Sequence, residues 1–322
     1  MNNFYKITNF SRKIKFIYLV FILVILSYSM ANSATGDTLK VRTIEFGKEK
    51  KGKYLFPGKG ERYEKILLNY KLKCPCLNWD YLAHVFVNGY EIFRYITPYG
   101  IGISLGSGTT WVADVSDFEP FLHDSVDIDA PNSQEDLELT FDFIKGTPPR
   151  DVIRVEQLWT LYFDYNKDFE SKVSEKAFLL TPDEKMARLK IIQTGHGMSN
   201  AHNCCEFCQK LGYVKVNGEQ KYQQLIWRSD CPRNPLFPQG GTWLYERSNW
   251  CPGADVRNYN YELTPFLPAS DSLRIDYDME YYDEPNPGSA PNYRLTGYLI
   301  TYSAPNFKND AAMVDIIAPT DK

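Results

Sequence analysis

The chain of 322 residues predicts an all-β protein made of two domains. Helical periodicity is scarce, whereas several segments alternate between apolar and polar residues, which indicates strands with one buried and one solvated face. Many short strands broken by turn clusters are typical of sandwiches and jelly rolls. The length also exceeds what one hydrophobic core usually organises. We place the junction at residues 146–149 (Gly-Thr-Pro-Pro), with a first domain over residues 36–148 and a second over residues 150–322.

The first 31 residues are predicted to be a secretory signal peptide. Arg12, Lys13 and Lys15 precede an uninterrupted apolar run over residues 16–26, and small residues follow that run. The run is shorter than the roughly twenty residues that a transmembrane helix needs. We therefore expect cleavage and a secreted or periplasmic mature chain; an uncleaved membrane anchor is the alternative.

The charge of the mature chain excludes two classes of partner. Removing residues 1–31 takes away four basic and no acidic side chains, which leaves 32 Lys and Arg against 40 Asp and Glu. Binding of nucleic acids or anionic lipids depends on clusters of Lys and Arg that neutralise phosphates. We therefore expect no nucleic acid and, after signal cleavage, no membrane as a partner, and we expect a monomer.

Three segments show the strand alternation most clearly: residues 66–73, 137–143 and 273–281. In each of them every second residue is apolar and most of the intervening residues are charged or polar, as in antiparallel sheets with one face in water. Asn88 and Gly89 separate two further apolar runs and predict a two-residue hairpin, because both turn positions need a positive φ.

Seven cysteines in an exported chain predict three disulfides and one remaining thiol. They form three groups, namely Cys74 with Cys76, Cys204 with Cys205 and Cys208, and Cys231 with Cys251. A bridge between Cys231 and Cys251 would close a loop of about twenty residues, worth about 3 kcal/mol in the chain-entropy model. Pairing between Cys74 and Cys76 is an open question because the loop is so short. Cys205 is either a buried free thiol or exchanges places with Cys204.

Residues 74–81 hold the first candidate functional group. Asp80 lies between Trp79 and Tyr81, directly after the first cysteine pair. Apolar surroundings disfavour the charged carboxylate and raise its pKa, which suits a group that exchanges a proton near neutral pH. The alternative is an ordinary aspartate that caps a turn at the entry of a strand.

Two further groups lie in the second half. Glu206 stands between Cys204 and Cys208, so a small disulfide loop would present it rigidly; a metal site with the flanking His196 and His202 is the alternative. Residues 231–253 would hold Arg247 and Trp250 on a second disulfide-braced loop, or would be a purely structural loop. Aromatic residues make up 15% of the chain and either fill the cores or stack on sugars.

At these three places the sequence resembles the peptide-N-glycosidase F family, whose members are amidases that remove whole N-linked glycans from asparagine. The likeness runs in order through nearly the whole mature chain. It is carried by residues 76–80 (Cys-Leu-Asn-Trp-Asp), 94–99 (Arg-Tyr-Ile-Thr-Pro-Tyr), 114–118 (Asp-Val-Ser-Asp-Phe), 146–148 (Gly-Thr-Pro), 204–208 (Cys-Cys-Glu-Phe-Cys) and 247–253 (Arg-Ser-Asn-Trp-Cys-Pro-Gly).

The resemblance implies two eight-stranded jelly rolls side by side, with the active site in the cleft between them. It implies that Asp80 activates the water that attacks the asparagine amide, and that Glu206 positions and stabilises the reacting groups. Four residues would shape the site for the first sugars: Trp79, Tyr81, Arg247 and Trp250. The substrates would be N-linked glycopeptides and glycoproteins, and no metal or organic cofactor would be needed.

One departure from the family pattern bears on activity. A further family glutamate, in a Thr-Glu-Thr-Trp context, has no clear equivalent in residues 127–132, and Asp129 is the nearest candidate. A relative that binds glycans without hydrolysing them, or that has altered specificity, is therefore the first alternative. A copper monooxygenase is the second, but it would need several histidines, and this chain has only four, at positions 84, 123, 196 and 202.

Overall fold

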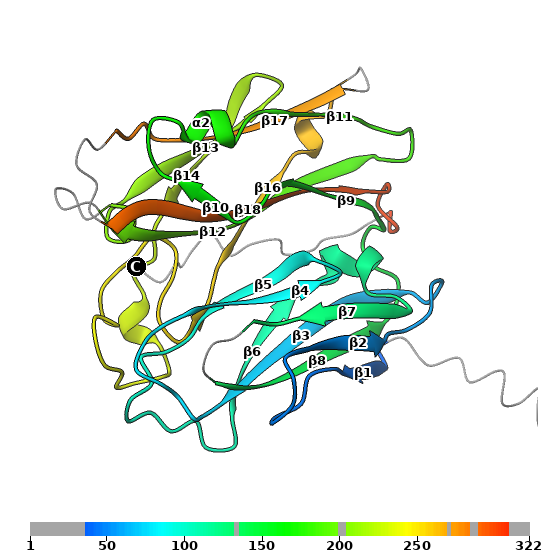
Figure 1. Ribbon diagram of the computed structural model, residues 1–322. Helices are drawn as coiled ribbons and strands as arrows, with labels where there is room; N and C mark the ends of the chain where they lie inside the picture. The colour runs from blue at the N-terminus through cyan, green and yellow to red at the C-terminus, as the bar shows by residue number, and fades with distance from the viewer. Residues whose placement is uncertain (1–35, 132–134, 199–203, 269–271, 284–288, 309–322) are drawn as a thin grey trace, which may run out of the picture. The chain divides into compact units, whose positions relative to one another are not determined.

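The fold is all-β, as predicted. The computed structural model describes residues 36–131, 135–198, 204–268, 272–283 and 289–308, and the predicted signal peptide lies outside these residues. From Thr38 onward the described residues belong to one compact unit. Figure 1 shows four sheets in this unit, two built by the first half of the chain and two by the second. Every strand pair within the sheets is antiparallel.

The first half forms two sheets. One contains, in spatial order, β1 (Thr38–Arg42), β8 (Asp136–Lys145), β3 (Tyr63–Lys73) and β6 (Thr109–Asp114). The other contains β15 (Ala254–Asp255), β5 (Tyr90–Ile96), β4 (Leu82–Val87), β7 (Ser125–Asp129) and β2 (Lys51–Leu55). A 3-10 helix, η1 (Ser116–Phe121), connects β6 to β7.

The second half repeats this strand order. One sheet contains β10 (Tyr162–Asp164), β18 (Ser289–Tyr302), β12 (Met186–Met198) and β16 (Asn258–Glu262), with β9 (Val152–Trp159) also paired to β18. The other contains β11 (Lys176–Leu179), β17 (Ser272–Met279), β13 (Lys210–Val216) and β14 (Glu219–Ile226). The short helical turns are α2 (Phe169–Lys172), η2 (Cys231–Arg233) and η3 (Thr264–Phe266). Both strand orders are compatible with the predicted jelly rolls, and the predicted junction at residues 146–149 lies between β8 and β9.

The alternating segments form the strands predicted for them. In β3 and β8 the alternate apolar residues are buried, and in β17 the pattern holds to Met279. The prediction that Tyr281 continues the buried face of that strand is wrong, because Tyr281 lies beyond β17 and is 73% exposed. The hairpin is confirmed, because Asn88 (φ 50°) and Gly89 (φ 87°) join β4 to β5.

The two halves share one continuous hydrophobic boundary. The core of the first half extends onto β12 and β18 through Ile192, Tyr298 and Ile300, while a separate core fills the space between the sheets of the second half. The sheet that contains β5, β4, β7 and β2 ends in β15, which comes from the second half of the chain. In this pairing Ala254 lies opposite Ile96. The halves are therefore joined by packing and by a shared sheet.

A buried ion cluster, called here the interface cluster, consists of His84, Glu91, Arg94, Thr194 and Thr296. Arg94 donates from Nε and Nη2 to the two oxygens of Glu91, each at 2.7 Å. Its Nη1 donates across the boundary to Thr194 Oγ1 at 3.2 Å, and Thr296 Oγ1 donates to Glu91 Oε2 at 2.6 Å. Although burial alone would raise the pKa of Glu91, Arg94 and His84 hold it far below its usual range.

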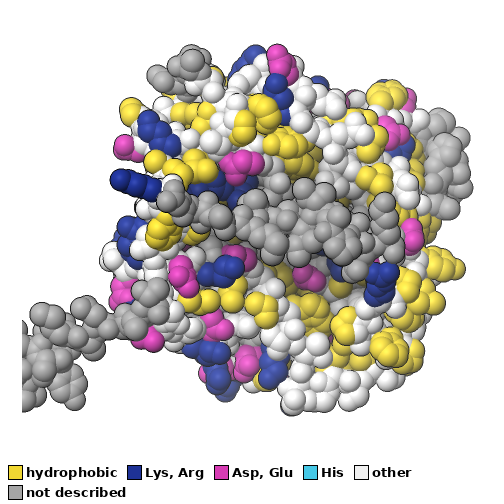
Figure 2. Space-filling model, turned by 180° about the vertical axis from the view of Figure 1, so that it is seen from behind, with side chains coloured by type: hydrophobic (Ala, Val, Ile, Leu, Met, Phe, Trp, Pro, Cys, Tyr) yellow, Lys and Arg dark blue, Asp and Glu magenta, His cyan; other side chains and the backbone are white. Residues whose placement is uncertain are grey.

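The surface of the described residues carries both signs of charge. Among the side chains coloured in Figure 2, Lys and Arg lie close to Asp and Glu, and neither sign of charge forms a large separate patch. None of the helices in the described part of the chain is long and apolar enough to cross a membrane.

Candidate functional site

Asp80 is placed by a short loop between β3 and β4 that is fixed at both ends. The Cys74–Cys76 disulfide is present at its start. Gly100 N–H donates to the Leu77 carbonyl at 2.7 Å, and the approach is so close that a Cβ on Gly100 would lie 2.3 Å from the Cβ of Cys76. A side chain at position 100 would therefore push the Asp80 loop out of place.

The neighbours of Asp80 point outward. Tyr81 exchanges two hydrogen bonds with Thr97, from Tyr81 N–H to Oγ1 at 2.7 Å and from Thr97 N–H to the Tyr81 carbonyl at 2.9 Å. With this anchoring, Trp79 remains 64% exposed and Tyr81 43% exposed, so both rings present faces to solvent. Asp80 itself is half-buried.

Glu206 is presented by the second disulfide loop. The Cys204–Cys208 bridge closes the loop, as predicted. Glu206 N–H donates to the Gly197 carbonyl at 2.8 Å, and the Glu206 carbonyl accepts from Ser248 N–H at 3.0 Å. The loop is thus tied to β12 on one side and to the segment that carries Arg247 on the other.

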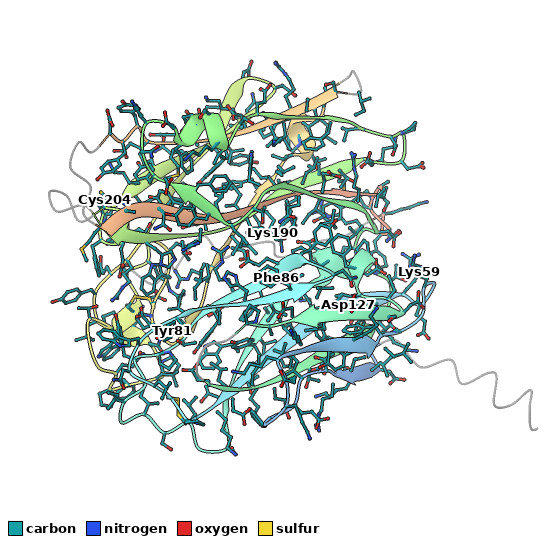
Figure 3. All side chains as sticks on the ribbon, viewed as in Figure 1. Lys59, Tyr81, Phe86, Asp127, Lys190 and Cys204 are labelled. Atoms are coloured by element: carbon teal, nitrogen blue, oxygen red, sulfur yellow. A yellow bond between two sulfur atoms is a disulfide. The ribbon has the colours of Figure 1, made fainter. Side chains whose placement is uncertain are left out.

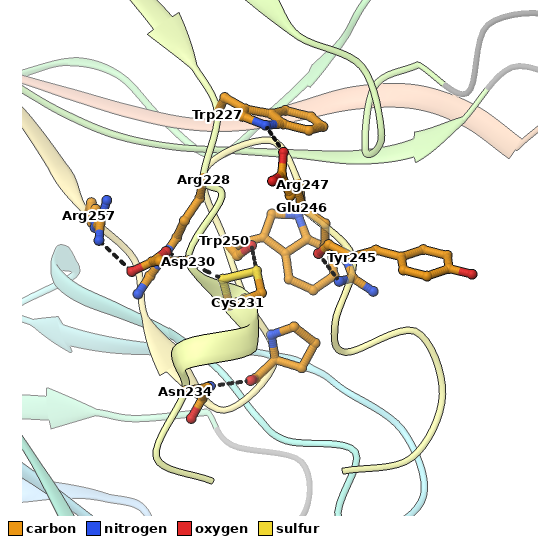
Figure 4. Close-up of a disulfide and its surroundings, with 12 residues drawn as sticks. Trp227, Arg228, Asp230, Cys231, Asn234, Tyr245, Glu246, Arg247, Trp250 and Arg257 are labelled. Carbon is orange, nitrogen blue, oxygen red and sulfur yellow. Dashed lines mark hydrogen bonds and ion pairs between the residues drawn. A yellow bond between two sulfur atoms is a disulfide. The ribbon is translucent and has the colours of Figure 1, made fainter. Parts of the chain in front are cut away.

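Arg247 is fully buried and links the parts of the site. Its Nε donates to Glu206 Oε1 at 3.2 Å, its Nη1 to the Tyr245 carbonyl at 2.8 Å and its Nη2 to Thr242 Oγ1 at 2.6 Å. The guanidinium also lies 4.6 Å from the ring centre of Trp250. Figure 4 shows Arg247 between Tyr245 and Trp250, beside the disulfide of Cys231.

The segment from residue 227 to residue 257 holds Arg247 against both halves. The Cys231–Cys251 disulfide braces it, as predicted. Arg228 and Arg247 form an isolated antiparallel bridge, with N···O distances of 2.8 and 3.1 Å. At the far end of the segment β15 joins β5. Arg247 is therefore fixed by covalent, backbone and sheet contacts.

The two carboxylates influence each other. Burial raises the pKa of Asp80, while the positive charge of Arg247 and a hydrogen bond from Tyr99 oppose the rise. Burial also raises the pKa of Glu206; Arg247 opposes this, and the negative charge of Asp80 adds to it. Both groups are therefore disposed to carry a proton at higher pH than ordinary carboxylates.

Two residues of the site were missed by sequence reasoning. Tyr99 is buried, and its hydroxyl lies 3.4 Å from Thr242 Oγ1, which accepts from Arg247. Tyr99 belongs to the matched motif over residues 94–99, which was a usable signal. Thr242 carries no such signal, because only the folded loop brings it to Arg247.

Asp129 does not join the site. It lies on β7 opposite Phe86, which is at the far end of β4 from Asp80. Phe86 is the fifth residue of β4, which begins two residues after Asp80, so the strand alone carries Phe86 about 13 Å from its start. In Figure 3, Tyr81 and Asp127 lie at opposite ends of the sheet. The expectation that Asp129 replaces the missing family glutamate is therefore wrong in its geometry, because Asp129 is an exposed residue of β7 that pairs with Phe86 on one side and Lys51 on the other.

Arg247 and Trp250 differ from their expected role as sugar contacts. Trp250 is 3% exposed, donates from its indole N–H to the Gly195 carbonyl at 2.8 Å and stacks on His196. Arg247 is buried as well; it bonds Glu206, and Trp250 packs against its guanidinium. Of the predicted sugar contacts, Trp79 and Tyr81 have exposed rings.

The histidines have separate partners. His84 contacts Glu91 and His123 contacts Glu119, at 2.6 and 2.7 Å. His196 contacts Thr194 at 2.8 Å, and burial lowers its pKa to about 3, which keeps it neutral. His202 lies outside the described residues. Within the described ranges, no three His, Cys, Asp or Glu side chains gather as a metal-binding group.

The cysteine that the three bridges leave over is Cys205, which is free and buried. Burial raises its pKa, so the thiol stays protonated and unreactive. This outcome agrees with the first of the two expectations for Cys205, the buried free thiol.

Chemically, the arrangement resembles a pair of acid–base carboxylates around one buried cation. Two carboxylates from different halves have raised pKa values and share the influence of one guanidinium, which bonds only Glu206 directly. Such a pair can take up a proton from water and return it during a single reaction.

Comparisons with known proteins agree on one family. A family model described as peptide-N-glycosidase F, C terminal, matches residues 164–304. The chain is 25% identical over 313 residues to peptide-N(4)-(N-acetyl-beta-D-glucosaminyl)asparagine amidase F of Elizabethkingia miricola, covering 86% of this chain and 88% of that protein. The solved structure of PNGase F from Flavobacterium meningosepticum matches with a TM-score of 0.71 and 23% identity, over 83% of this chain and 96% of that one. A structure of PNGF-II matches with a TM-score of 0.64 and 16% identity, over 83% and 66% of the two chains.

Proposed function

Since the chain is a divergent member of the peptide-N-glycosidase F family, we propose that it hydrolyses the amide that joins an N-linked glycan to an asparagine side chain. The reaction releases the whole glycan and converts the asparagine to aspartate. The substrates are N-linked glycopeptides and glycoproteins.

One observation carries the proposal: Asp80 and Glu206, which are 126 positions apart in the sequence, both experience the positive charge of the buried Arg247, which bonds Glu206 at 3.2 Å. Burial raises the pKa of each carboxylate, and the same guanidinium opposes each rise. A structural ion pair would lower the carboxylate pKa values, as in the interface cluster. The raised values are typical of groups that exchange protons in catalysis.

In the proposed reaction Asp80 is the general base. It takes a proton from a water molecule whose oxygen forms a bond to the amide carbon of the asparagine. The tetrahedral intermediate then collapses, the carbon–nitrogen bond breaks, and the nitrogen leaves with the proton as a glycosylamine. Asp80 is thereby returned to its ionised form.

Glu206 positions the reacting groups. Its Oε1 accepts from Arg247, and we assign Oε2 to the substrate or to the attacking water. Because Glu206 belongs to a disulfide loop tied by backbone hydrogen bonds, its carboxylate is held in place before substrate binds. Trp79 and Tyr81, with exposed rings beside Asp80, supply stacking faces for the first sugars.

We also propose that the mature protein acts outside the cytoplasm. The leader over residues 1–31 has the signal-peptide pattern, and three disulfides form among the described cysteines. Disulfides persist in oxidising compartments. The proposed substrates, secreted and cell-surface glycoproteins, are found in the same environment.

The test is mass spectrometry of a defined N-glycopeptide after incubation with the protein and with its Asp80→Asn variant. The wild type is expected to yield the sugar-free peptide with Asn converted to Asp. The variant is expected to be slower by about 10³-fold or more, because it lacks the general base.

Two outcomes would contradict the proposal. A peptide that keeps one sugar would mean that a glycosidic bond was cut. A peptide that returns intact but binds the protein would favour the glycan-binding alternative, which the outward position of Asp129 supports. Equal activity of wild type and Asp80→Asn would remove Asp80 from the mechanism.

A further inference from the structure

Three loops beside the candidate site carry no charged side chain. They cover residues 74–79, 97–108 and 234–245, and none of them contains Lys, Arg, Asp, Glu or His, although Lys, Arg, Asp and Glu make up 24% of the chain. The first loop leads directly into Asp80, and the third ends two residues before Arg247. The surroundings of the site therefore differ in composition from the rest of the protein.

The three loops contact one another and form one surface. The Leu77 carbonyl accepts from Gly100 N–H at 2.7 Å, which joins the first loop to the second. Tyr99 N–H donates to Gln239 Oε1 at 3.1 Å, which joins the second to the third. At Gly241 φ is +58° and a Cβ would lie 3.0 Å from the Tyr99 ring, so glycine allows this close packing.

Five large apolar side chains of these loops project into solvent, and we call them the apolar rim: Leu77, Ile101, Phe237, Leu244 and Tyr245. Each is between 50% and 72% exposed, so none of them serves to fill a core. Single apolar residues scattered over a surface need no explanation, but a group of them on touching loops marks an interaction surface.

The apolar rim is continuous with the candidate site. The ring of Tyr245 meets that of Phe207 edge-on, with 6.0 Å between their centres, and Phe207 directly follows Glu206. Figure 4 shows the Tyr245 ring directed away from the neighbouring disulfide. At the other end of the rim, the loop that carries Leu77 also carries Asp80. A ligand bound at the two carboxylates therefore lies next to the rim.

The chemistry of the rim favours polypeptide over glycan as its occupant. A glycan presents hydroxyl groups around every ring, and each hydroxyl that loses water needs a polar partner. Four of the five rim side chains have no polar atom, and only Tyr245 carries a hydroxyl. Apolar side chains of a polypeptide gain free energy when they are buried on such a surface. Because an N-linked substrate consists of a glycan and a polypeptide, the rim suits the polypeptide.

We propose that the apolar rim binds apolar side chains next to the glycosylated asparagine, so that the protein selects glycosylation sites with apolar flanks. This inference rests on the proposed function for its place in catalysis. Binding of the polypeptide, however, can be measured without any hydrolysis. Contacts made away from the reacting bond strengthen binding of the substrate and its transition state alike, so they act mainly on KM.

The binding test uses two fluorescently labelled, sugar-free peptides in which the asparagine is flanked by leucines or by serines. Fluorescence anisotropy is expected to show the leucine peptide bound about tenfold more tightly. The double variant Ile101→Ser, Phe237→Ser should lose this preference. The matched control Leu55→Ser, Leu179→Ser should keep it, because it removes two equally exposed apolar side chains from the edge strands β2 and β11.

The kinetic test uses two glycopeptides with these same flanks and one N-glycan. The ratio of their kcat/KM values, leucine to serine, is expected to be about tenfold for wild type and about one for the rim variant. The change should lie in KM. Thermal unfolding shows whether each variant folds, and if the double variant does not, Ile101→Ser and Phe237→Ser are tested singly.

Four outcomes would overturn the inference. The first is equal affinity of wild type for both peptides, and the second is an equal loss of preference in the control variant. The third is a rim variant that also loses affinity for a free N-glycan, because the rim would then be a glycan surface. The fourth is a wild-type dimer in sedimentation that dissociates in the rim variant, because a second copy would then cover the rim.

The two tests also separate this inference from the proposed function. Selective binding of the leucine peptide, without hydrolysis of either glycopeptide, would end the amidase proposal and support the rim as a polypeptide site. Hydrolysis of both glycopeptides at the same rate, without selective binding, would do the reverse.

Discussion

Two buried arginines, Arg94 and Arg247, each pair with a glutamate where the two halves meet, yet the carboxylates shift in opposite directions. Glu91 receives two hydrogen bonds from Arg94 and one from Thr296, with His84 at 2.6 Å, and its pKa falls. Glu206 receives one bond at 3.2 Å from Arg247, and its pKa rises. Burial acts against the charge in both places.

The difference lies in how the donors of each arginine are distributed. Arg94 directs two of its nitrogens to a single carboxylate, so the negative charge is stabilised more than burial destabilises it. Arg247 spreads its donors over Glu206, Thr242 and a carbonyl, and Asp80 adds a second negative charge nearby. The carboxylate of the interface cluster thus has enough hydrogen-bond donors to stay ionised, which suits a structural role. The carboxylates of the candidate site have fewer donors for their charge, which suits groups that exchange protons.

The largest expected effect is on stability. Glu91→Gln should lower the free energy of unfolding by about 3–5 kcal/mol, because it leaves Arg94 buried without its anion. The matched variant Glu206→Gln should cost only about 1 kcal/mol, since Arg247 keeps its other partners. Urea unfolding of both variants measures the difference, and equal losses would break the contrast drawn between the two arginines.

The next effect is on activity. Glu206→Gln should lower kcat by about 10²-fold on an N-glycopeptide, because the amide cannot carry the charge that positions the reacting groups. Glu206→Asp, which keeps the charge but shortens the side chain, is the control for reach. A Glu206→Gln variant as active as wild type would assign the glutamate to structure, like Glu91.

The smallest expected effect is on the pH dependence of stability, and its sign differs between the two regions. Because the pKa of Asp80 is raised by folding, its contribution to stability falls as the pH rises above about 4. Asp80→Asn should therefore be more stable than wild type at pH 7, with the gap closing toward pH 4. The pKa of Glu91 is lowered by folding. The stability that ionised Glu91 contributes is therefore complete above about pH 4.5 and is lost as the pH falls further.

Unfolding curves recorded between pH 3 and pH 7 for wild type, Asp80→Asn and Glu91→Gln would show these opposite slopes. An Asp80→Asn variant that is less stable than wild type at pH 7 would mean that ionised Asp80 is well solvated or fully paired. That result would contradict the raised pKa on which its role as a base depends.

The sequence predicts the parts of the fold that have a local signal. The strands β3, β8 and β17 follow from period-two alternation, and the hairpin follows from Asn88 and Gly89. The bridge between Cys231 and Cys251 follows from cysteine grouping, whereas the sequence leaves the pairing of Cys74 with Cys76 and the choice between Cys204 and Cys205 open. The cysteine-braced settings of Asp80 and Glu206 single them out in the sequence, and in the structure Arg247 acts electrostatically on both.

Other features have no local signal. Glu91 and Arg94 stand in an apolar strand, and nothing near them in the sequence announces that Thr194 and Thr296, roughly a hundred and two hundred residues later, complete their hydrogen bonds. The family resemblance implies a sugar contact at Trp250, but its indole N–H donates to the Gly195 carbonyl inside the protein. The contact of Thr242 with Arg247 likewise depends on the folded loop.

Because β15 comes late in the chain, the sheet that it joins in the first half is completed only when most of the protein has been synthesised. A chain is made from its N-terminus, so β5 is finished about 160 residues before Ala254 arrives to cover its edge. Until then the growing polypeptide exposes an unpaired strand edge of the kind that invites pairing with other chains. The same segment delivers Arg247, so the proposed active site and the protection of that edge are acquired in a single late step.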